Sequence, residues 1–446
     1  MLDTKWHHTQ RLLHTVQRRE RGSMRTEALA RLAEERVDHR FKGLPPDADG
    51  LTVGELAAQR RNLFRDADGF TTPVLTLSAE RLEHNLALLG TYTARHGLAF
   101  APHGKTPMAP QLFHRQIGHG AWGITLAVPH QVRVARAFGV ERVFLANELV
   151  DAAALRWIAA ELAADPAFRL VCYVDSVRGV ELMDAALRGA PRPVDVVVEL
   201  AAGEGARTGV RTEADAVAVA DAVAAAGTLR LVGVAGYEAQ VPGASPERVR
   251  AWLERLVALA VEFDGAGRFE GAGEIVVSAG GSEWFDAVAD VFAAVPALSL
   301  PVLKLLRSGA YVSHDDVHYS RLTPFNRVPG EGALEPALRL WAQVVSRPSA
   351  TEAFVNAGKR DVGHDFDLPV ARVVRRNGTE HPAAGIEVSA LSDQHLWLRT
   401  GADADVEVGD WIGFGLSHPC TNFDRWQLIP VTEADGTVVD YIRTFF

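Results

Sequence analysis

Apolar and polar positions follow a regular alternation from about residue 98 onward. Short apolar runs rich in β-forming residues are each followed by a longer Ala-, Leu-, Val- and Arg-rich segment with helical spacing. The predicted strands are 98–104, 121–126, 142–146, 168–174, 194–200, 229–236, 274–279 and 302–306. The predicted helices between them are 129–138, 149–164, 176–188, 212–226, 246–263 and 283–294. Eight strands alternating with helices predict a (β/α)₈ barrel, with an open doubly wound sheet as the alternative.

The pattern differs on either side of this region. After about residue 335 the helical periodicity fades, and short alternating segments between turn residues predict an antiparallel β domain. Residues 1–70 are rich in Arg, Glu and Ala, and we expect a helical extension there that wraps on the main body. The predicted domains are therefore 1–70, a barrel over 71–330, and a β domain over 331–446.

Composition narrows the class of protein without identifying a function. The chain has 446 residues, of which 48% are hydrophobic and 23% charged, as in ordinary globular proteins. Its net charge of −10 argues against nucleic acid as a partner. No apolar run is long enough to span a bilayer, and the N-terminus lacks the apolar core of a signal peptide. Two cysteines exclude a disulfide framework, so a cytoplasmic location is expected.

Lys105 stands out in the segment FAPHGKTPMAP, at the end of the first predicted barrel strand. Only five of the 46 basic residues are lysine, so the chain otherwise relies on arginine for positive charge. A desolvated lysine can lose its proton and attack an aldehyde, whereas arginine cannot. His103 lies two residues earlier and would point the same way on an extended strand, which suits a carbonyl cofactor at the barrel mouth. A solvated surface charge is the other interpretation.

Two glycine-containing loops follow the seventh and eighth predicted strands. Gly280, Gly281 and Ser282 precede a helix, and the segment LRSGAY places Gly309 and Ala310 after the last strand. Backbone N–H groups at such places bind anions, and barrels frequently hold phosphate in the loops after these two strands. Ordinary strand-to-helix turns would also use Gly and Ser.

Arg207 and Tyr237 follow the fifth and sixth predicted strands. Arg207 lies in a loop bounded by glycines and could hold a cofactor oxygen or a substrate carboxylate. Tyr237, in the segment GYEAQ, could pack against a flat ring or donate a hydrogen bond. A surface arginine and a core tyrosine are the plainer interpretations.

His418 and Cys420, in the segment SHPC, form a second chemical signal. Pro419 favours an extended conformation at His418, so the imidazole and the thiol are expected to project to one side. This pair is typical of a zinc site, and an incomplete protein shell suits catalysis. Asp424 or a group from 313–319 could supply a further ligand. A tight turn with a buried cysteine is the alternative.

Together these segments resemble the pyridoxal-phosphate enzymes of the alanine-racemase-like fold, in the metal-dependent branch of D-serine dehydratase and D-threonine aldolase. The resemblance runs from about residue 70 to the C-terminus. It rests on TPVLTLSAERLEHNL (72–86), PHGKTPM (102–108), ARTGV (206–210), GYEAQ (236–240), SAGGS (278–282), RSGAY (307–311) and SHPC (417–420). The lysine segment and the His-X-Cys pair are its specific parts, and the 70-residue extension departs from the simplest members.

The resemblance implies a cofactor, a metal and an assembly. Pyridoxal phosphate would attach to Lys105, with Arg207 near its ring and zinc on His418 and Cys420. The phosphate would lie near the two loops, at Gly280, Gly281, Ser282, Gly309 and Ala310. The β domain of one subunit usually completes the partner's site in this fold, so a homodimer is implied.

The implied substrate is a β-hydroxy D-amino acid. Loss of its hydroxyl would give a 2-oxo acid and ammonia, whereas cleavage of the Cα–Cβ bond would give glycine and an aldehyde. Cys420 favours dehydration, because within the family a cysteine here resembles the dehydratase and an aspartate the aldolase. A non-catalytic pyridoxal-phosphate protein is a second hypothesis, opposed by the β domain and SHPC. A metal-dependent barrel hydrolase would leave Lys105 and the two loops unexplained.

Overall fold

The computed structural model describes residues 22–401 and 403–446, and this part of the chain forms two compact units. The first unit contains 22–25, 90–104 and 114–309, and the second contains 26–89, 105–113 and 310–446. The division therefore differs from the linear domains predicted from the sequence. Strand β1 (Val74–Ser78) pairs with strands of the C-terminal domain and not with the barrel, so residues 26–89 group with that domain.

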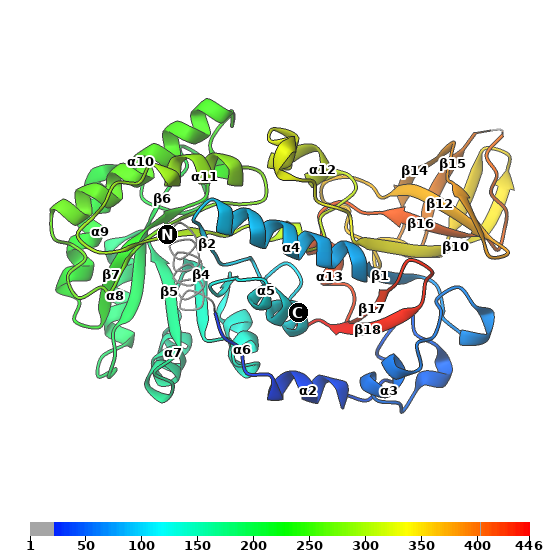
Figure 1. Ribbon diagram of the computed structural model, residues 1–446, viewed down its shortest axis with the longest axis horizontal. Coiled ribbons are helices and arrows are strands. Elements are labelled where there is room, and N and C mark those ends of the chain that lie inside the picture. The colour runs from blue at the N-terminus through cyan, green and yellow to red at the C-terminus, as the bar shows by residue number, and fades with distance from the viewer. Residues whose placement is uncertain (1–21, 402) are drawn as a thin grey trace, which may run out of the picture. The chain divides into compact units, whose positions relative to one another are not determined.

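The first unit is the predicted barrel (Figure 1). Its eight parallel strands pair in the order β2-β9-β8-β7-β6-β5-β4-β3. They are β2 (Ala99–Phe100), β3 (Ile124–Leu126), β4 (Arg142–Glu148), β5 (Arg169–Val174), β6 (Val194–Leu200), β7 (Leu229–Gly236), β8 (Ile275–Ala279) and β9 (Val302–Leu306). Buried side chains from these strands fill the interior, among them Phe144, Tyr173, Val197 and Val276. The predicted (β/α)₈ fold is thus confirmed.

The ring of strands closes between the first and the second. His103 forms a parallel bridge with Thr125, and the N–H of Gly104 donates to the Thr125 carbonyl at 2.8 Å. The N–H of Trp122 donates in turn to the Phe100 carbonyl at 2.6 Å. These bonds satisfy the backbone at the join, so the sheet has no open edge there.

Six helices follow the strands, and their first residues explain where they begin. They are α6 (Pro129–Ala137), α7 (Ala152–Ala164), α8 (Val177–Ala186), α9 (Glu213–Ala225), α10 (Pro246–Gly265) and α11 (Phe285–Ala293). Ser176, Thr212 and Ser245 each accept a hydrogen bond from the backbone N–H three residues later, as expected of helix N-caps. Two further helices, α4 (Ala79–Arg95) and α5 (Pro110–Gly118), cross the division between the units.

The second unit is built on a mostly antiparallel sheet in the order β13-β12-β16-β10-β1-β17-β18, with β11, β15 and β14 continuing from β10. Among the described strands of this sheet, β1 and β17 are the pair that runs in parallel. Its later strands are β10 (Leu338–Ser349), β11 (Glu352–Val355), β12 (Val370–Arg376), β13 (Thr379–Pro382), β14 (Ile386–Leu391), β15 (Leu396–Thr400), β16 (Trp411–Gly415), β17 (Leu428–Thr432) and β18 (Val438–Arg443). Short helices α12 (His318–Leu322) and α13 (Cys420–Phe423) lie in its loops. The predicted antiparallel β domain is confirmed.

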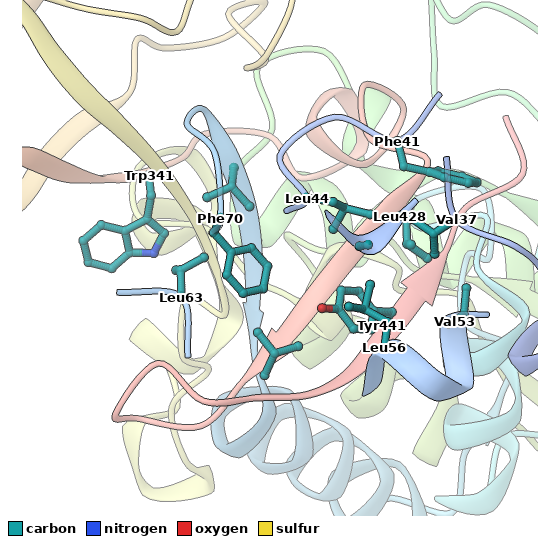
Figure 2. Packing of buried hydrophobic residues seen from close by; sticks show 13 residues of the cluster. Val37, Phe41, Leu44, Val53, Leu56, Leu63, Phe70, Trp341, Leu428 and Tyr441 are labelled. Carbon is teal, nitrogen blue, oxygen red and sulfur yellow. The ribbon is translucent and has the colours of Figure 1, made fainter. Parts of the chain in front are cut away.

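The N-terminal extension forms a layer of this second unit. Apolar side chains from 37–70 pack with Trp341, Leu428, Val438 and Tyr441 of the sheet in one buried cluster (Figure 2). Between residues 22 and 70, the described part of the extension, helical structure is limited to α2 (Glu27–Ala33), α3 (Val53–Ala58) and the short turns η1 (Pro46–Ala48) and η2 (Asp66–Asp68). The extension is therefore less helical than predicted, because its apolar residues anchor an irregular chain to the sheet. The prediction for residues 1–21 lies outside the described residues.

No helix in the described ranges combines the length and the apolar character needed to cross a membrane.

Candidate active site

Lys105 lies in a turn, residues 104–107, that follows the closure of the barrel. Strand β2 ends at Phe100, so the alternation expected to align His103 with Lys105 does not apply. The side chain of Lys105 is exposed, while the next residue, Thr106, is 1% exposed. The desolvation that would lower the pKa of a lysine is therefore not evident from the exposure of this side chain.

His418 and Cys420 come together through a tight turn. His418 has a φ of 51°, and Pro419 is already helical at φ −54° as α13 begins. The extended conformation predicted for His418 is therefore wrong. The N–H of His418 donates to Asp315 Oδ2 at 3.0 Å, and this contact, with those of the ring, stabilises a backbone conformation that non-glycine residues rarely adopt.

The imidazole of His418 is held on two sides. Its Nδ1 lies 2.5 Å from Asp365 Oδ2, and the Phe366 ring stacks on it at 4.3 Å between centroids, with 19° between the planes. Asp365 Oδ1 in turn accepts a hydrogen bond from the Thr421 hydroxyl at 2.8 Å. The ring orientation is thus fixed, and Nε2 is the nitrogen that remains for a metal.

Electrostatics at this pair favour a cation. Burial lowers the pKa of His418, but the hydrogen bond and charge of Cys420, together with Asp365, outweigh burial and raise it to about 9. In the absence of a metal the imidazole therefore holds a second proton at neutral pH. A metal ion would replace that positive charge among the same negative partners.

Thr106 links the lysine segment to the metal pair. Its hydroxyl oxygen lies 3.1 Å from Cys420 Sγ, although 314 residues separate the two in sequence. Both residues belong to the second unit, as does Lys105. The residue next to Lys105 therefore contacts the thiol directly, within one chain.

Glu238 occupies the backbone donors that the sequence assigned to a phosphate. The N–H groups of Gly280 and Gly281 donate to its two carboxylate oxygens at 2.8 and 2.7 Å. Burial raises the pKa of Glu238, and these two hydrogen bonds oppose that effect. These two N–H groups are thus already satisfied by a protein carboxylate, which corrects the role predicted for Gly280 and Gly281 as direct donors.

The loops after β8 and β9 nevertheless meet. The hydroxyls of Ser282 and Ser308 lie 3.5 Å apart, which brings RSGAY beside SAGGS. A Cβ added at Gly281 would lie 2.7 Å from the Tyr237 ring, so glycine is needed for that ring to cover the loop. The two hydroxyls, together with the backbone of Gly309 and Ala310, lie where a phosphate is expected.

Arg207 lies in the loop after β6 and is exposed, with its backbone N–H donating to Gln240 at 3.2 Å. Burial raises the pKa of the Tyr237 phenol. Gln240 belongs to the short helix η3 (Glu238–Gln240), which begins one residue after Tyr237. The loops that carry the two predicted cofactor residues are therefore joined within the first unit.

Sequence reasoning missed four residues that shape these places: Thr106, Glu238, Arg307 and Asp365. Arg307 is 2% exposed and donates from Nε to Ser278 Oγ at 2.9 Å. Arg307 could have been identified from its place at the start of the loop segment RSGAY, and Thr106 from its position directly after Lys105. Asp365 lies 53 residues from His418 and gave none. Asp424 and Asp315, considered as ligands, instead bind Arg425 and the His418 backbone.

The donor groups fit the implied metal and cofactor. Imidazole and thiol are ligands that zinc prefers, and a carboxylate bound to the other imidazole nitrogen is the usual support for such a ligand. The hydroxyls of Ser282 and Ser308 converge where a phosphate is expected, and the side chain of Lys105 is exposed.

Comparisons with known proteins support the fold and the family. Residues 77–294 match the family described as "Alanine racemase, N-terminal domain", and residues 337–432 match the "Putative serine dehydratase domain". The resemblance to the alanine-racemase-like pyridoxal-phosphate enzymes is confirmed. Within this class the chain is similar to the branch of D-serine dehydratase and D-threonine aldolase, as its sequence predicts.

Individual relatives extend over most of the chain. D-threonine aldolase of Arthrobacter sp is 26% identical over 374 residues, which cover 83% of this chain and 90% of that protein. The 3-hydroxy-D-aspartate aldolase of Paracoccus denitrificans (strain Pd 1222) is 28% identical over 363 residues, covering 78% and 89%. The crystal structure of D-threonine aldolase from Filomicrobium marinum is similar at a TM-score of 0.70 with 26% identity, covering 84% and 95%.

Proposed function

We propose that this chain is a pyridoxal-phosphate- and zinc-dependent lyase that eliminates water from a β-hydroxy D-amino acid such as D-serine, giving a 2-oxo acid and ammonia. The observation that carries the proposal is the 3.1 Å contact between Thr106 and Cys420. It joins the segment of the predicted cofactor lysine to the predicted metal pair, although 314 residues separate the two in sequence. A homodimer in the cytoplasm is part of the proposal.

The roles of the residues follow from their chemistry. Pyridoxal phosphate, when bound, supplies an electron sink for negative charge at Cα of the substrate. Lys105 would hold the cofactor, accept the Cα proton after the substrate amine releases it, and so act as the general base. Ser282, Gly309 and Ala310 would hold the phosphate, with Arg207, Tyr237 and His103 near the ring.

His418 Nε2 and Cys420 Sγ would hold the zinc ion, whose Lewis acidity suits a departing β-hydroxyl. Asp365 fixes the imidazole through Nδ1, and Thr106 contacts the thiol from the lysine side. Two protein ligands leave positions for water or substrate oxygens.

Product analysis tests the function. Purified, metal-loaded protein is incubated with a panel of D- and L-β-hydroxy amino acids that includes serine, threonine and 3-hydroxyaspartate. A 2-oxo acid and ammonia from a D-isomer support the dehydratase. The proposed function is contradicted if only L-isomers are turned over. It is also contradicted if a protein shown to contain cofactor and zinc turns over no substrate of the panel.

Retro-aldol cleavage to glycine and an aldehyde is the second candidate function, favoured by the two aldolases among the relatives. It would use the same residues, with the β-hydroxyl losing its proton instead of leaving. Glycine and an aldehyde in the same assay would establish it.

Replacing Asp365 with Asn should weaken zinc binding about 10- to 100-fold, because a neutral amide supports the His418 imidazole less well than a carboxylate. Asp424→Asn is the matched control, since the Asp424 carboxylate pairs with Arg425 at 2.9 Å. Zinc affinity is measured by competition with a chromogenic chelator. Equal affinities for the two variants would show that Asp365 does not support the metal.

Mixing Lys105→Ala chains with His418→Ala chains should not restore activity beyond that of either variant. The Thr106–Cys420 contact lies within one chain, so the lysine and the metal pair of a site are expected to share a subunit. Subunit exchange is verified by native mass spectrometry of the mixed dimers. Recovery to about a quarter of wild-type turnover would instead place the two groups on different subunits.

A further inference from the structure

Three carboxyl groups gather inside the barrel, apart from the residues considered so far. Glu148 ends β4, Asp175 follows β5, and Glu199 lies near the end of β6. One oxygen from each lies within 4.8 Å of the others. All three come from the carboxyl ends of strands, where barrels place their functional groups.

Strand geometry directs these side chains inward. Tyr173 and Val197 are paired across β5 and β6 and belong to the interior core. Glu199 lies two residues after Val197 on β6, which puts it on the same face of that strand. Asp175 directly follows β5, and its carboxyl oxygen lies within 4.8 Å of the other two. Glu148 reaches this face through a register shift between Leu145 and Glu148, which brings it opposite Tyr173.

The Tyr173 phenol is the second, independent sign of a ligand. Tyr173 is 3% exposed, and among the described residues its hydroxyl has no hydrogen-bond partner. Tyr173 pairs with Glu148 across β4 and β5 and lies two residues before Asp175. Burial raises the pKa of its phenol, the Arg307 charge lowers it, and the charges of Glu199 and Glu148 raise it. Glu199 is 6% exposed, and apart from the hydrogen bond between the two carboxyl groups, Glu148 Oε1 and Glu199 Oε2 have no donor within the described ranges. Buried polar atoms of this kind need an explanation.

We propose that Glu148, Asp175 and Glu199, with Tyr173 beside them, form a site for a hard divalent cation such as Mn²⁺, Mg²⁺ or Ca²⁺. All of these groups offer oxygen, the donor that such ions prefer. Two oxygens bound to one Ca²⁺ at 2.3–2.6 Å lie at most about 5 Å apart, so the observed spacing fits such an ion. The site differs in chemistry from the imidazole and thiol of His418 and Cys420.

Charge also favours a cation. Burial and the Glu199 charge raise the pKa of Glu148 to about 8, so without an ion the pair retains a proton at neutral pH. A divalent ion would displace that proton and allow all three carboxylates to be ionised.

The site would stabilise the loop that carries Arg207. Asp175 Oδ2 accepts from the Gly209 N–H at 3.1 Å, and the Val210 N–H donates to the Glu199 carbonyl at 2.8 Å. Gly209 has a φ of 92°, and an added Cβ would lie 2.6 Å from Ala201 N, so the loop fits closely against β6. An ion bound to Asp175 and Glu199 would therefore hold 201–210 in place.

Manganese binding tests the site without depending on turnover. The full-length protein with His418→Ala and Cys420→Ala is prepared with its cofactor, freed of metal and titrated with Mn²⁺, with free Mn²⁺ followed by electron paramagnetic resonance. We expect one Mn²⁺ per chain and slower hydrogen exchange over 201–210. Adding Glu199→Gln or Glu148→Gln should weaken binding at least tenfold, whereas the exposed Glu254→Gln control should not.

Two outcomes would overturn the proposal. The first is that the His418→Ala, Cys420→Ala variant, with native near-ultraviolet circular dichroism, binds no Mn²⁺ at millimolar concentration. Glu148 and Glu199 would then be a carboxyl pair that shares a proton and binds no metal. The second is binding that Glu199→Gln and Glu148→Gln leave unchanged. The experiment gives the same answer whether the reaction is dehydration, aldol cleavage or neither, so its failure is separate from failure of the proposed function.

Discussion

Replacing Cys420 with Ala should lower the rate of dehydration on the order of 10³-fold or more, while the protein stays folded and yellow. Hydroxide is a poor leaving group in water, and removing the metal removes the charge stabilisation that helps it depart. Zinc content and turnover are measured on the same samples, before and after chelation. The cofactor absorbance should persist, since the donors proposed for pyridoxal phosphate do not include Cys420.

Two controls sharpen this test. Cys420→Asp keeps a metal ligand and copies the aldolase-like pattern, so it should retain zinc and shift products towards glycine and an aldehyde. Cys172→Ala removes the other thiol, which is fully buried in β5. If chelated protein shown to be free of metal turns over at the untreated rate, SHPC is only a turn and the mechanism is wrong.

Replacing Lys105 with Arg should abolish attachment of the cofactor and lower turnover by about 10³-fold or more. Arginine keeps the positive charge, but it neither forms the covalent link nor gives up a proton at neutral pH. Lys359→Arg is the matched control, because Lys359 is also exposed. Borohydride reduction of the wild-type protein followed by peptide mapping should place the pyridoxyl group on Lys105. Recovery of that group on Lys304 or Lys359 would contradict the assignment.

The barrel was predictable because each of its strands is a short apolar run bounded by helical segments. The place of β1 in the second unit could not be predicted in this way. Its sequence, VLTLS, would suit a barrel strand, and only its pairing with β10, through contacts such as Val74 with Trp341, assigns it to the other unit. Local patterns show that a strand forms but carry no information on a partner more than 200 residues away.

The metal pair illustrates a similar limit. The sequence identified both residues, yet predicted an extended His418 from the preference of a residue before proline. Contacts with Asp315 and Asp365, 103 and 53 residues away, override that preference. In the same way, Gly280 and Gly281 were predicted to donate to a phosphate, and the carboxylate of Glu238 competes for the same N–H groups.

The layer formed by residues 37–70 affects how fragments of this protein can be designed. The matched family ranges start at residue 77, so a fragment cut to them would omit Val37, Phe41, Leu44, Val53 and Leu56. Each of these buried side chains contributes about 1.5–3 kcal/mol, and together they contribute on the order of 10 kcal/mol, comparable to the net stability of a whole domain. Such a fragment would expose the apolar face of β17 and β18 and is expected to aggregate. The boundary suggested by homology is therefore not a boundary for independent folding.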